Sequence, residues 1–360
     1  MIGIVYGYCV KHGGVGRYIT ETITHFKNPS NFELLTIEKN SNTPTTKTIL
    51  INCERDLRFM SIKENKSFSN KIKELFEKYD IIHSHGVYDF LLDIYTAHIC
   101  LASYFGKFIE IFGKEYLPEH LRKDYHKLIN LEERMLSNLH EEGLIAVSNK
   151  VAEDLSNRYK ISKKRIEIVS GSSRFCKEKG TENKKKDFCT IGFTGGNLYA
   201  KGIVFMKDIF NRLVSKGIRL RCVGVGCNDD IKKFLETNSR YEINVMGKSD
   251  IQKDFYRKLD IYLCLSIYEG YSLSTLEAMS LGVPVISSNL NGVFYDAKEE
   301  LPLARIEDVS DTNEVIGMIE KIIFDEYFRN KVVDSGYKIV NRLSWADVAT
   351  KYESIYQKFL

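Results

Sequence analysis

The feature that most constrains this chain is an alternation of short β-rich apolar runs with longer amphipathic stretches, which restarts after a polar segment. Such alternation is typical of parallel sheets flanked by helices. The pattern predicts strands at 2–8, 79–86, 106–113, 142–148 and 165–171, and then at 188–196, 218–226, 241–247, 260–266 and 283–288. Because 360 residues exceed what one core usually holds, two α/β units are expected.

The same pattern predicts the domain boundaries. We expect a Rossmann-like domain over 1–173, a linker over 174–187, a second Rossmann-like domain over 188–340 and a C-terminal amphipathic helix over 341–360. Apolar residues recur at helical spacing through the last stretch, from Trp345 to Phe359, which favours the helix.

Composition indicates an ordinary soluble protein, with 43% hydrophobic and 28% charged residues. The net charge of +4 is not the footprint of a nucleic-acid binder, and the local excess lies in the linker. A solvated linker is the plain interpretation, with anchoring to anionic lipid as the alternative. The start of the chain has no signal-peptide pattern, and no apolar run reaches the roughly 18 residues of a membrane span. The eight cysteines form no C-x-x-C pair, which favours a reducing compartment, so we expect a cytoplasmic protein.

The most informative stretch is "YEGYSLSTLEAMSLGVPVISSNLNG", residues 268–292. Glu269 and Glu277 bracket a Gly- and Ser-containing loop that follows a predicted strand and opens into a predicted helix. Ser274 and Glu277 fit a capping box, which would account for Glu277 alone. A helix start also suits a phosphate, and carboxylates suit vicinal sugar hydroxyls, so the stretch favours a nucleotide sugar as ligand.

These residues resemble the E-x(7)-E signature of the family 4 retaining glycosyltransferases, which have the GT-B fold. The resemblance continues in "GGVGRY" near the start, "HSHG" at 83–86, "IAVS" at 145–148, "KG" at 201–202, "RCVGVG" at 221–226 and the terminal "SWADVATKYESIY". It implies two Rossmann-like parallel-sheet domains that face each other across a cleft, with the C-terminal helix packing back on the N-terminal domain.

The resemblance implies a donor site mainly in the second domain. Glu277 would hold the ribose hydroxyls, and Glu269 would contact the transferred sugar. Lys201 would lie on the phosphates, where it and Glu269 are the candidate catalytic residues. The remaining candidate donor-binding residues of this domain are Gly195, Gly196, Gly270, Ser272, Leu273 and Ser274, the last three through their backbone at the helix start.

In the first domain, the resemblance implies that Gly13, Gly14, Gly16 and Arg17 approach the donor, since glycines let a ligand come close to the main chain. His85 would lie on the acceptor side, although a structural role is an open alternative. His83 and His85 lack an evident third metal ligand, and "NDD" at 228–230 is interpreted as a surface turn. We therefore expect neither a metal nor a cofactor.

Three positions depart from the family pattern. Phe112 stands where a histidine usually follows a strand, Gly196 replaces an arginine, and Ser170-Gly171 replaces Asn-Gly. Loss of an arginine removes a bidentate phosphate partner. Either Lys11, Arg17 or another cation substitutes for it, or the enzyme is slow or degenerate.

The expected function is transfer of a hexosyl or N-acetylhexosaminyl group, with retention, from a nucleoside-diphosphate sugar to a hydroxyl. UDP is preferred to GDP, and the acceptor would be a glycan or lipid-linked molecule in cell-surface polysaccharide or glycoconjugate synthesis. Peripheral contact with the inner face of a membrane is an open alternative, and no nucleic-acid partner is expected. Two other functions stay open: a nucleotide-sugar epimerase of similar fold, and a degenerate nucleotide-binding subunit of a transferase complex.

Overall fold

The computed structural model describes residues 1–7, 13–37, 47–51, 62–178, 188–237, 239–246, 253–298 and 304–360. The described residues divide into two compact units, one formed by 1–171 with 345–360 and the other by 172–344. Residues 172–178, which include the start of the predicted linker, belong to the second unit. The rest of that linker, 179–187, lies outside the described residues, as does Lys11.

The first unit is built on a parallel sheet with the strand order β3-β2-β1-β4-β5-β6-β7. The strands are β1 (Ile2–Val5), β2 (Phe32–Thr36), β3 (Lys47–Leu50), β4 (Ile81–Ser84), β5 (Ile94–Ala97), β6 (Leu144–Ala146) and β7 (Ile166–Ile168). The central strands β1, β4 and β5 are buried along their whole length, because helices cover both faces of a parallel sheet. The edge strand β3 is partly exposed.

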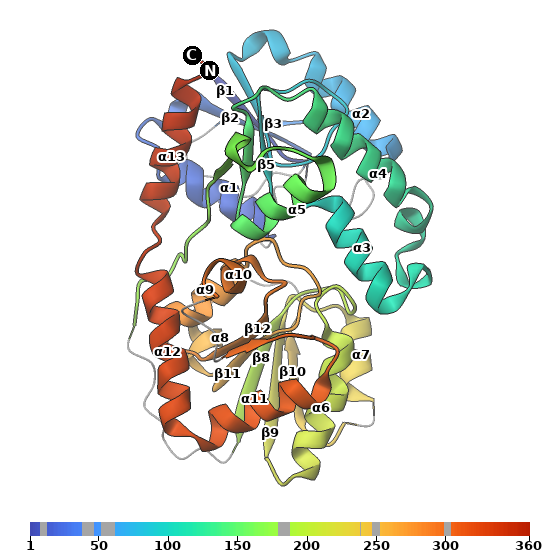
Figure 1. Ribbon diagram of the computed structural model, residues 1–360, viewed down its shortest axis with the longest axis vertical. Helices are drawn as coiled ribbons and strands as arrows, with labels where there is room; N and C mark the ends of the chain where they lie inside the picture. Colours follow the sequence, from blue (N-terminus) through green and yellow to red (C-terminus); the bar gives the residue numbers. More distant parts are fainter. Residues whose placement is uncertain are drawn as a thin grey trace. The chain divides into compact units, whose positions relative to one another are not determined.

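The described helices of this unit are α1 (Gly14–Thr24), α2 (Ile62–Lys73), α3 (Leu101–Phe112), α4 (Glu119–Ser137), α5 (Asn149–Tyr159) and α13 (Trp345–Gln357). Short 3-10 turns lie at Pro29–Asn31, Phe76–Lys78, Lys114–Tyr116 and Lys163–Arg165. Figure 1 shows α1 and α13 side by side on one flank of the sheet, where they contact each other. Helix α3 packs against α4 and α5.

The second unit has a parallel sheet with the order β10-β9-β8-β11-β12-β13. Its strands are β8 (Cys189–Thr194), β9 (Leu220–Val225), β10 (Glu242–Met246), β11 (Ile261–Cys264), β12 (Val285–Ser288) and β13 (Arg305–Ile306). Its helices are α6 (Ile203–Ser215), α7 (Asp229–Glu236), α8 (Lys253–Arg257), α9 (Leu273–Ser280), α10 (Gly292–Asp296), α11 (Thr312–Phe324) and α12 (Glu326–Val340). Helix α12 packs on α9 and on α11. The predicted fold class of two Rossmann-like parallel-sheet domains is confirmed.

The prediction of a strand at 106–113 is wrong, because this stretch belongs to helix α3. The buried residues Leu101, Tyr104, Phe105 and Phe108 recur every three or four positions, which is the spacing of one helix face. The strand of this region is β5, which ends at Ala97, before helix α3 begins, and was not predicted. Helix α1 begins at Gly14, within the "GGVGRY" stretch.

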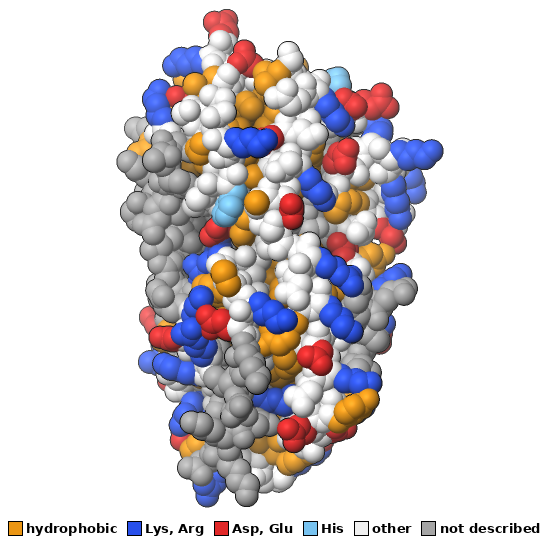
Figure 2. Space-filling model, turned by 90° about the vertical axis from the view of Figure 1, so that its left-hand side faces the viewer, with side chains coloured by type: hydrophobic (Ala, Val, Ile, Leu, Met, Phe, Trp, Pro, Cys, Tyr) orange, Lys and Arg blue, Asp and Glu red, His pale blue; other side chains and the backbone are white. Residues whose placement is uncertain are grey.

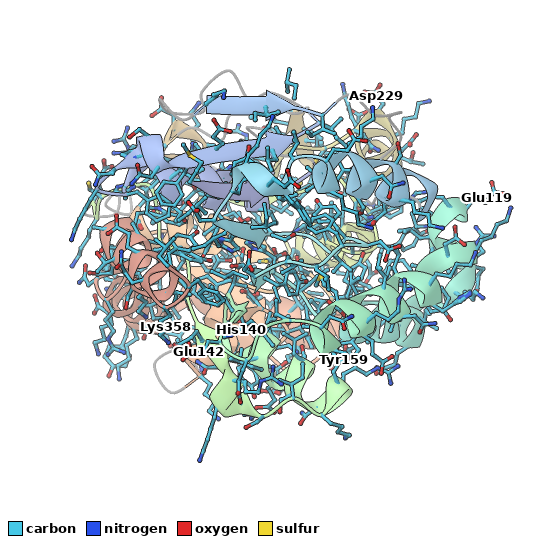
Figure 3. The ribbon with its side chains drawn as sticks, turned by 90° about the horizontal axis from the view of Figure 1, so that it is seen from above. Glu119, His140, Glu142, Tyr159, Asp229 and Lys358 are labelled. Carbon is cyan, nitrogen blue, oxygen red and sulfur yellow. The ribbon has the colours of Figure 1, made fainter. Side chains whose placement is uncertain are left out.

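The C-terminal helix α13 packs on the first domain, as predicted. Its Tyr352 hydroxyl lies 3.0 Å from the Tyr18 hydroxyl of α1, which also donates to the Val169 carbonyl at 2.7 Å. Beyond the end of the helix, Lys358 Nζ lies 3.7 Å from a Glu142 carboxylate oxygen, and these residues are seen near His140 in Figure 3. The helix is therefore fixed both by buried polar contacts and by its exposed end.

Candidate active site

Two loops at the carboxyl ends of neighbouring strands bring Lys201 and Glu269 together. The loop after β8 leads to Lys201, and the loop after β11 leads to Glu269, and these strands pair in parallel. Lys201 Nζ lies 2.5 Å from Glu269 Oε2, which also accepts a hydrogen bond from Ser266 Oγ at 2.9 Å. Both side chains are only partly buried, so the pair can be reached from solvent. The carboxyl ends of parallel strands are where ligands bind in open α/β sheets.

Glycine is required on both sides of Lys201. Gly195 has φ +140°, and a Cβ there would lie 2.6 Å from Lys201 Cγ. Gly202 has φ +62°, and a Cβ there would lie 2.1 Å from the Leu265 carbonyl oxygen. Any larger residue at either position would displace the loop that carries Lys201.

The backbone of Glu269 is fixed by the loop between β12 and α10. Its N–H donates to the Leu290 carbonyl at 2.9 Å, and its carbonyl accepts from the Gly292 N–H at 2.8 Å. Asn291 beneath this loop is fully buried, and its amide donates to Thr275 Oγ1 and Ser287 Oγ, both at 3.2 Å. Glu269 is therefore held by main-chain bonds and not by its side chain alone.

Helix α9 begins after Ser272, whose Oγ accepts from the Thr275 N–H at 3.3 Å. Ser274, within the first turn, accepts instead from the Tyr262 hydroxyl at 2.8 Å. The capping-box interpretation of Ser274 and Glu277 is thus wrong, because Ser272 is the capping residue and Glu277 lies in the second turn. The start of α9 carries the partial positive charge of a helix N-terminus beside Glu269.

Glu277 is 1% exposed, and its carboxylate is held inside the second domain. Oε1 lies 2.9 Å from Arg174 Nε, and Oε2 accepts from the Tyr256 hydroxyl at 2.8 Å. Sequence analysis identified neither partner. Arg174 lies in the basic stretch that was interpreted as a linker, and no spacing rule connects it to Glu277.

In the first domain, the candidate residues near the N-terminus lie at the start of α1. Gly13 is the residue before the helix, and its carbonyl accepts from the Arg17 N–H at 2.9 Å. Gly14 and Gly16 are helical, and a Cβ at Gly14 would meet no atom within 4 Å. The open space beside Gly14 lets a ligand approach its backbone, whereas Gly16 is buried within the first domain.

His85 lies directly after β4, where its Nδ1 is 3.0 Å from His98 Nε2. His83 is enclosed between the Tyr356 hydroxyl at 2.7 Å and Thr96 Oγ1 at 2.8 Å. Burial lowers the pKa of His83 and of His98 to about 3 and that of His85 well below its ordinary value. All three imidazoles are therefore neutral at pH 7.

The expectation that Phe112 replaces a histidine after a strand is wrong. Phe112 ends helix α3, whereas the residue directly after the strand β5 is His98. The pattern "IYTAH" could have revealed this, since a short apolar run ends at the histidine. The departure at Gly196 remains, because Gly196 lies in the loop between β8 and Lys201.

The residues at 228–230 begin a helix. Asn228 Oδ1 accepts from the Ile231 N–H at 3.0 Å, and Asp229 and Asp230 form the first turn of α7. Across the described ranges, no group of three or more His, Cys, Asp and Glu side chains is arranged to hold a metal ion. The same residues include no helix long and apolar enough to cross a membrane. On the face shown in Figure 2, acidic and basic side chains are interspersed.

Both halves of the chain match models of known glycosyltransferase families. Residues 12–171 match the family model described as Glycosyltransferase Family 4, and residues 189–319 match Glycosyl transferases group 1. An uncharacterized glycosyltransferase of Methanocaldococcus jannaschii is 22% identical over 78% of this chain and 76% of its own length. Protein CapJ of Staphylococcus aureus is 29% identical over 69% of this chain and 60% of its length. The capsular polysaccharide biosynthesis glycosyltransferase CapM, from the same organism, is 27% identical over 48% of this chain and 47% of its length. The chain thus spans less than two thirds of CapJ and CapM.

Solved structures share the fold over nearly the whole chain. WaaG, a glycosyltransferase involved in lipopolysaccharide biosynthesis, has a TM-score of 0.79 at 13% identity and covers 99% of both chains. HepE of Anabaena, in complex with UDP and glucose, has a TM-score of 0.69 at 13% identity with the same coverage. Taken together with the two family models, these likenesses show that the chain is a glycosyltransferase of the GT-B type.

Proposed function

We propose that this glycosyltransferase moves a hexosyl or N-acetylhexosaminyl group, with retention of configuration, from a nucleoside-diphosphate sugar to a hydroxyl group. The observation that carries the proposal is the contact of Lys201 with Glu269 beside the start of α9. A cation and a helix N-terminus suit a diphosphate, and a carboxylate suits sugar hydroxyls. UDP is favoured as the nucleotide, in keeping with HepE, which was solved with UDP and glucose.

In this proposal, the negative charge that develops on the leaving diphosphate is met by Lys201 and by the N–H groups of Ser272, Leu273 and Ser274. These donors suffice for the reaction without a metal ion or a cofactor. Glu269 orients the transferred sugar, and its present contact with Lys201 holds both side chains in place before the donor arrives. The leaving phosphate itself assists the incoming hydroxyl on the same face of the sugar, so no side chain serves as a nucleophile.

The remaining candidate residues have supporting roles in the proposal. Glu277 accepts hydrogen bonds from the ribose hydroxyls. The donor approaches the backbone at Gly195, Gly196 and Gly270. In the first domain, Gly13, Gly14, Gly16 and Arg17 contribute to donor binding, and His85 lies on the acceptor side together with His98. Neutral imidazoles suit an uncharged acceptor hydroxyl, because each can both donate and accept a hydrogen bond.

For the acceptor, we propose a glycan or a lipid-linked molecule in cell-surface polysaccharide or glycoconjugate synthesis, made at the cytoplasmic side of a membrane. The support comes from two similar proteins. CapM is a glycosyltransferase of capsular polysaccharide biosynthesis, and WaaG is a glycosyltransferase involved in lipopolysaccharide biosynthesis. His98 after β5 favours a working site over a degenerate subunit, because it occupies the position at which a histidine is usual.

The test begins with a thermal-shift panel of UDP, GDP, ADP, TDP and CMP and their sugar conjugates, with EDTA and then with Mg²⁺. A ligand at 100 times its Kd adds about 2.7 kcal/mol of stability, which is readily measured. Transfer is then followed with the selected sugar nucleotide and lipid-linked or free glycan acceptors, and the anomer of the product is assigned by NMR.

Lys201→Ala and Glu269→Gln are expected to lower turnover by about 10²–10³-fold. Lys216→Ala serves as the matched control, because Lys216 forms an exposed ion pair with Glu320 away from these loops. Free altered sugar nucleotide without an acceptor would indicate an epimerase. Nucleotide binding without any turnover would indicate a degenerate subunit, and either result refutes the proposal.

A further inference from the structure

We propose that Arg174 is a positioning residue for the transfer reaction, which together with Tyr256 holds the buried Glu277 carboxylate in the orientation that receives the ribose of the donor. This inference rests on the proposed function, which assigns the ribose hydroxyls to Glu277. It adds to that function a residue of the segment that follows the first domain.

The first argument is the burial of a charge. Glu277 is 1% exposed, and a carboxylate removed from water in this way is unfavourable unless a cation and hydrogen-bond donors accompany it. Arg174 Nε lies 2.9 Å from Oε1, and the Tyr256 hydroxyl donates to Oε2 at 2.8 Å. Arg174 supplies the cation and Tyr256 the donor.

The second argument is the geometry of the two contacts. Arg174 and Tyr256 approach different oxygens of Glu277, the first as an ion pair with Oε1 and the second as a hydrogen-bond donor to Oε2. Contacts at both oxygens fix the rotation of the carboxylate group, so its orientation depends on both residues.

The third argument is that Arg174 is itself held in place. Its guanidinium lies over the Phe175 ring, 4.8 Å from the centroid, and Phe175 packs edge-on against Tyr256. These contacts lie within the second domain, to which Arg174 belongs. The arginine is therefore packed against side chains of the second domain beside Glu277 and does not behave as a solvated linker side chain.

The same segment is fixed a second time, four residues further on. The Glu178 N–H donates to the carbonyl of Ser280, the last residue of α9, at 2.9 Å. The Glu178 carboxylate accepts from Lys253 at 2.9 Å and from Arg257 at 2.8 Å. Glu178 thus docks the segment without touching the Glu277 carboxylate, and this separation provides a matched control.

The experiment measures the Kd of UDP, or of GDP if the panel selects it, by calorimetry at pH 7. The variants are Arg174→Met, Arg174→Lys, Glu277→Gln and the Arg174→Met/Glu277→Gln double variant. Arg174→Met is expected to weaken binding about 10-fold, because the buried Glu277 carboxylate loses the cation beside it, and Arg174→Lys is expected to restore part of the affinity. In the Glu277→Gln background, the same change is expected to alter Kd by less than about 2-fold.

Rescue by lysine separates this role from a merely structural one. Arg174→Lys keeps a cation at position 174 and is expected to bind nucleotide more tightly than Arg174→Met, whereas equal Kd values for these two variants would show that the charge has no role. Arg257→Met is the control: it removes a cation that contacts Glu178 of the same segment, and its Kd is expected to stay within about 2-fold of the wild-type value. These comparisons require only the single variants, so they remain decisive even if the Glu277→Gln proteins bind too weakly to measure.

The outcomes are distinct. If no nucleotide binds the wild-type protein, the proposed function is refuted and this inference with it. If the wild-type protein binds and Arg174→Met behaves like Arg257→Met, the inference alone is refuted. Independent effects of Arg174→Met and Glu277→Gln in the double variant would refute it equally.

Discussion

A carboxylate in the first domain, Glu132, provides a pH-dependent test of the structure. It lies on α4 with no exposed surface, and its Oε2 accepts from the Leu101 N–H at 3.0 Å and from the Tyr159 hydroxyl at 2.6 Å. It thereby caps the start of α3 from a different helix. The described residues offer no hydrogen-bond partner to its Oε1. Burial raises the pKa of Glu132 to about 7, although hydrogen bonds with Tyr159 and with the backbone of Leu101 and Ala102 act in the opposite direction.

The sign and size of the effect follow from this pKa. The unfolded chain releases the proton of Glu132 near pH 4.5, whereas the folded protein keeps it up to about pH 7. The contribution of Glu132 to stability is therefore fully present below pH 4.5 and is lost as the pH rises through 7. With about 1.4 kcal/mol for each pH unit, the loss between pH 4.5 and 8 is about 3 kcal/mol.

Glu132→Gln removes this titration, while its amide oxygen can still accept from Leu101 and Tyr159. We expect the difference in unfolding free energy between the wild-type protein and this variant to change by about 3 kcal/mol from pH 4.5 to pH 8, which favours the variant at high pH. Trp345 is the single tryptophan and is buried in the first domain, so its fluorescence during urea unfolding reports the relevant transition. Glu133→Gln, at the exposed neighbouring position, is the control. Parallel pH profiles for the wild-type protein and Glu132→Gln would refute the reasoning.

Three further predictions use urea unfolding, followed by Trp345 fluorescence for the first domain and by far-UV circular dichroism for the second. Gly202→Ala places a Cβ against a carbonyl oxygen at a left-handed φ, so we expect the free energy of unfolding to fall by more than about 3 kcal/mol and nucleotide binding to weaken. Gly217 has φ +88° but open space where a Cβ would lie, so Gly217→Ala is expected to lower the free energy of unfolding by only about 1 kcal/mol and to leave nucleotide binding intact. Because burial lowers the pKa of His83 and His98 to about 3, their contribution is present above pH 6.5 and is lost on acidification, and we expect each to cost the first domain about 2 kcal/mol at pH 5. The measurement uses the Glu132→Gln variant, which lacks the opposing titration of Glu132, and a urea midpoint that is unchanged between pH 7 and pH 5 would contradict the prediction. Tyr18→Phe removes the hydrogen bond to the Val169 carbonyl and is expected to destabilise the first domain by about 1–3 kcal/mol, and an unchanged urea midpoint would show that water satisfies that carbonyl.

Some buried strands could be predicted from sequence and others could not. β1, β4 and β11 lie where strands were predicted, within largely apolar stretches that helices cover on both sides. The pattern failed at β2 and β5, which are equally buried, and at α3, whose "FIEIF" stretch alternates like a strand although its buried face has helical spacing. A few residues of either period are compatible with both structures, so only the surrounding fold decides between them.

The candidate site was predictable to a different extent in each of its parts. Lys201 and Glu269 were identified because the resemblance fixes their positions, but sequence alone does not show that they contact each other. That contact depends on Gly195 and Gly202, whose left-handed or otherwise strained conformations let the loop turn back over β11. Arg174 was missed for a physical reason: a cation that pairs with a buried carboxylate needs no hydrophobic pattern around it, and its basic neighbours look solvated.

The burial of Glu277 changes how its substitution should be interpreted. If Glu277 served only the ribose, Glu277→Gln would weaken nucleotide binding and leave the apo protein unchanged. Because its carboxylate is paired with Arg174, the same substitution also leaves the guanidinium without its counter-ion inside the second domain. A loss of stability in Glu277→Gln is therefore compatible with a role in binding, and only the comparison with Arg174→Met/Glu277→Gln separates the two contributions. In the proposed function, the strength of nucleotide binding and the docking of Arg174 on the second domain would thus be coupled through one carboxylate.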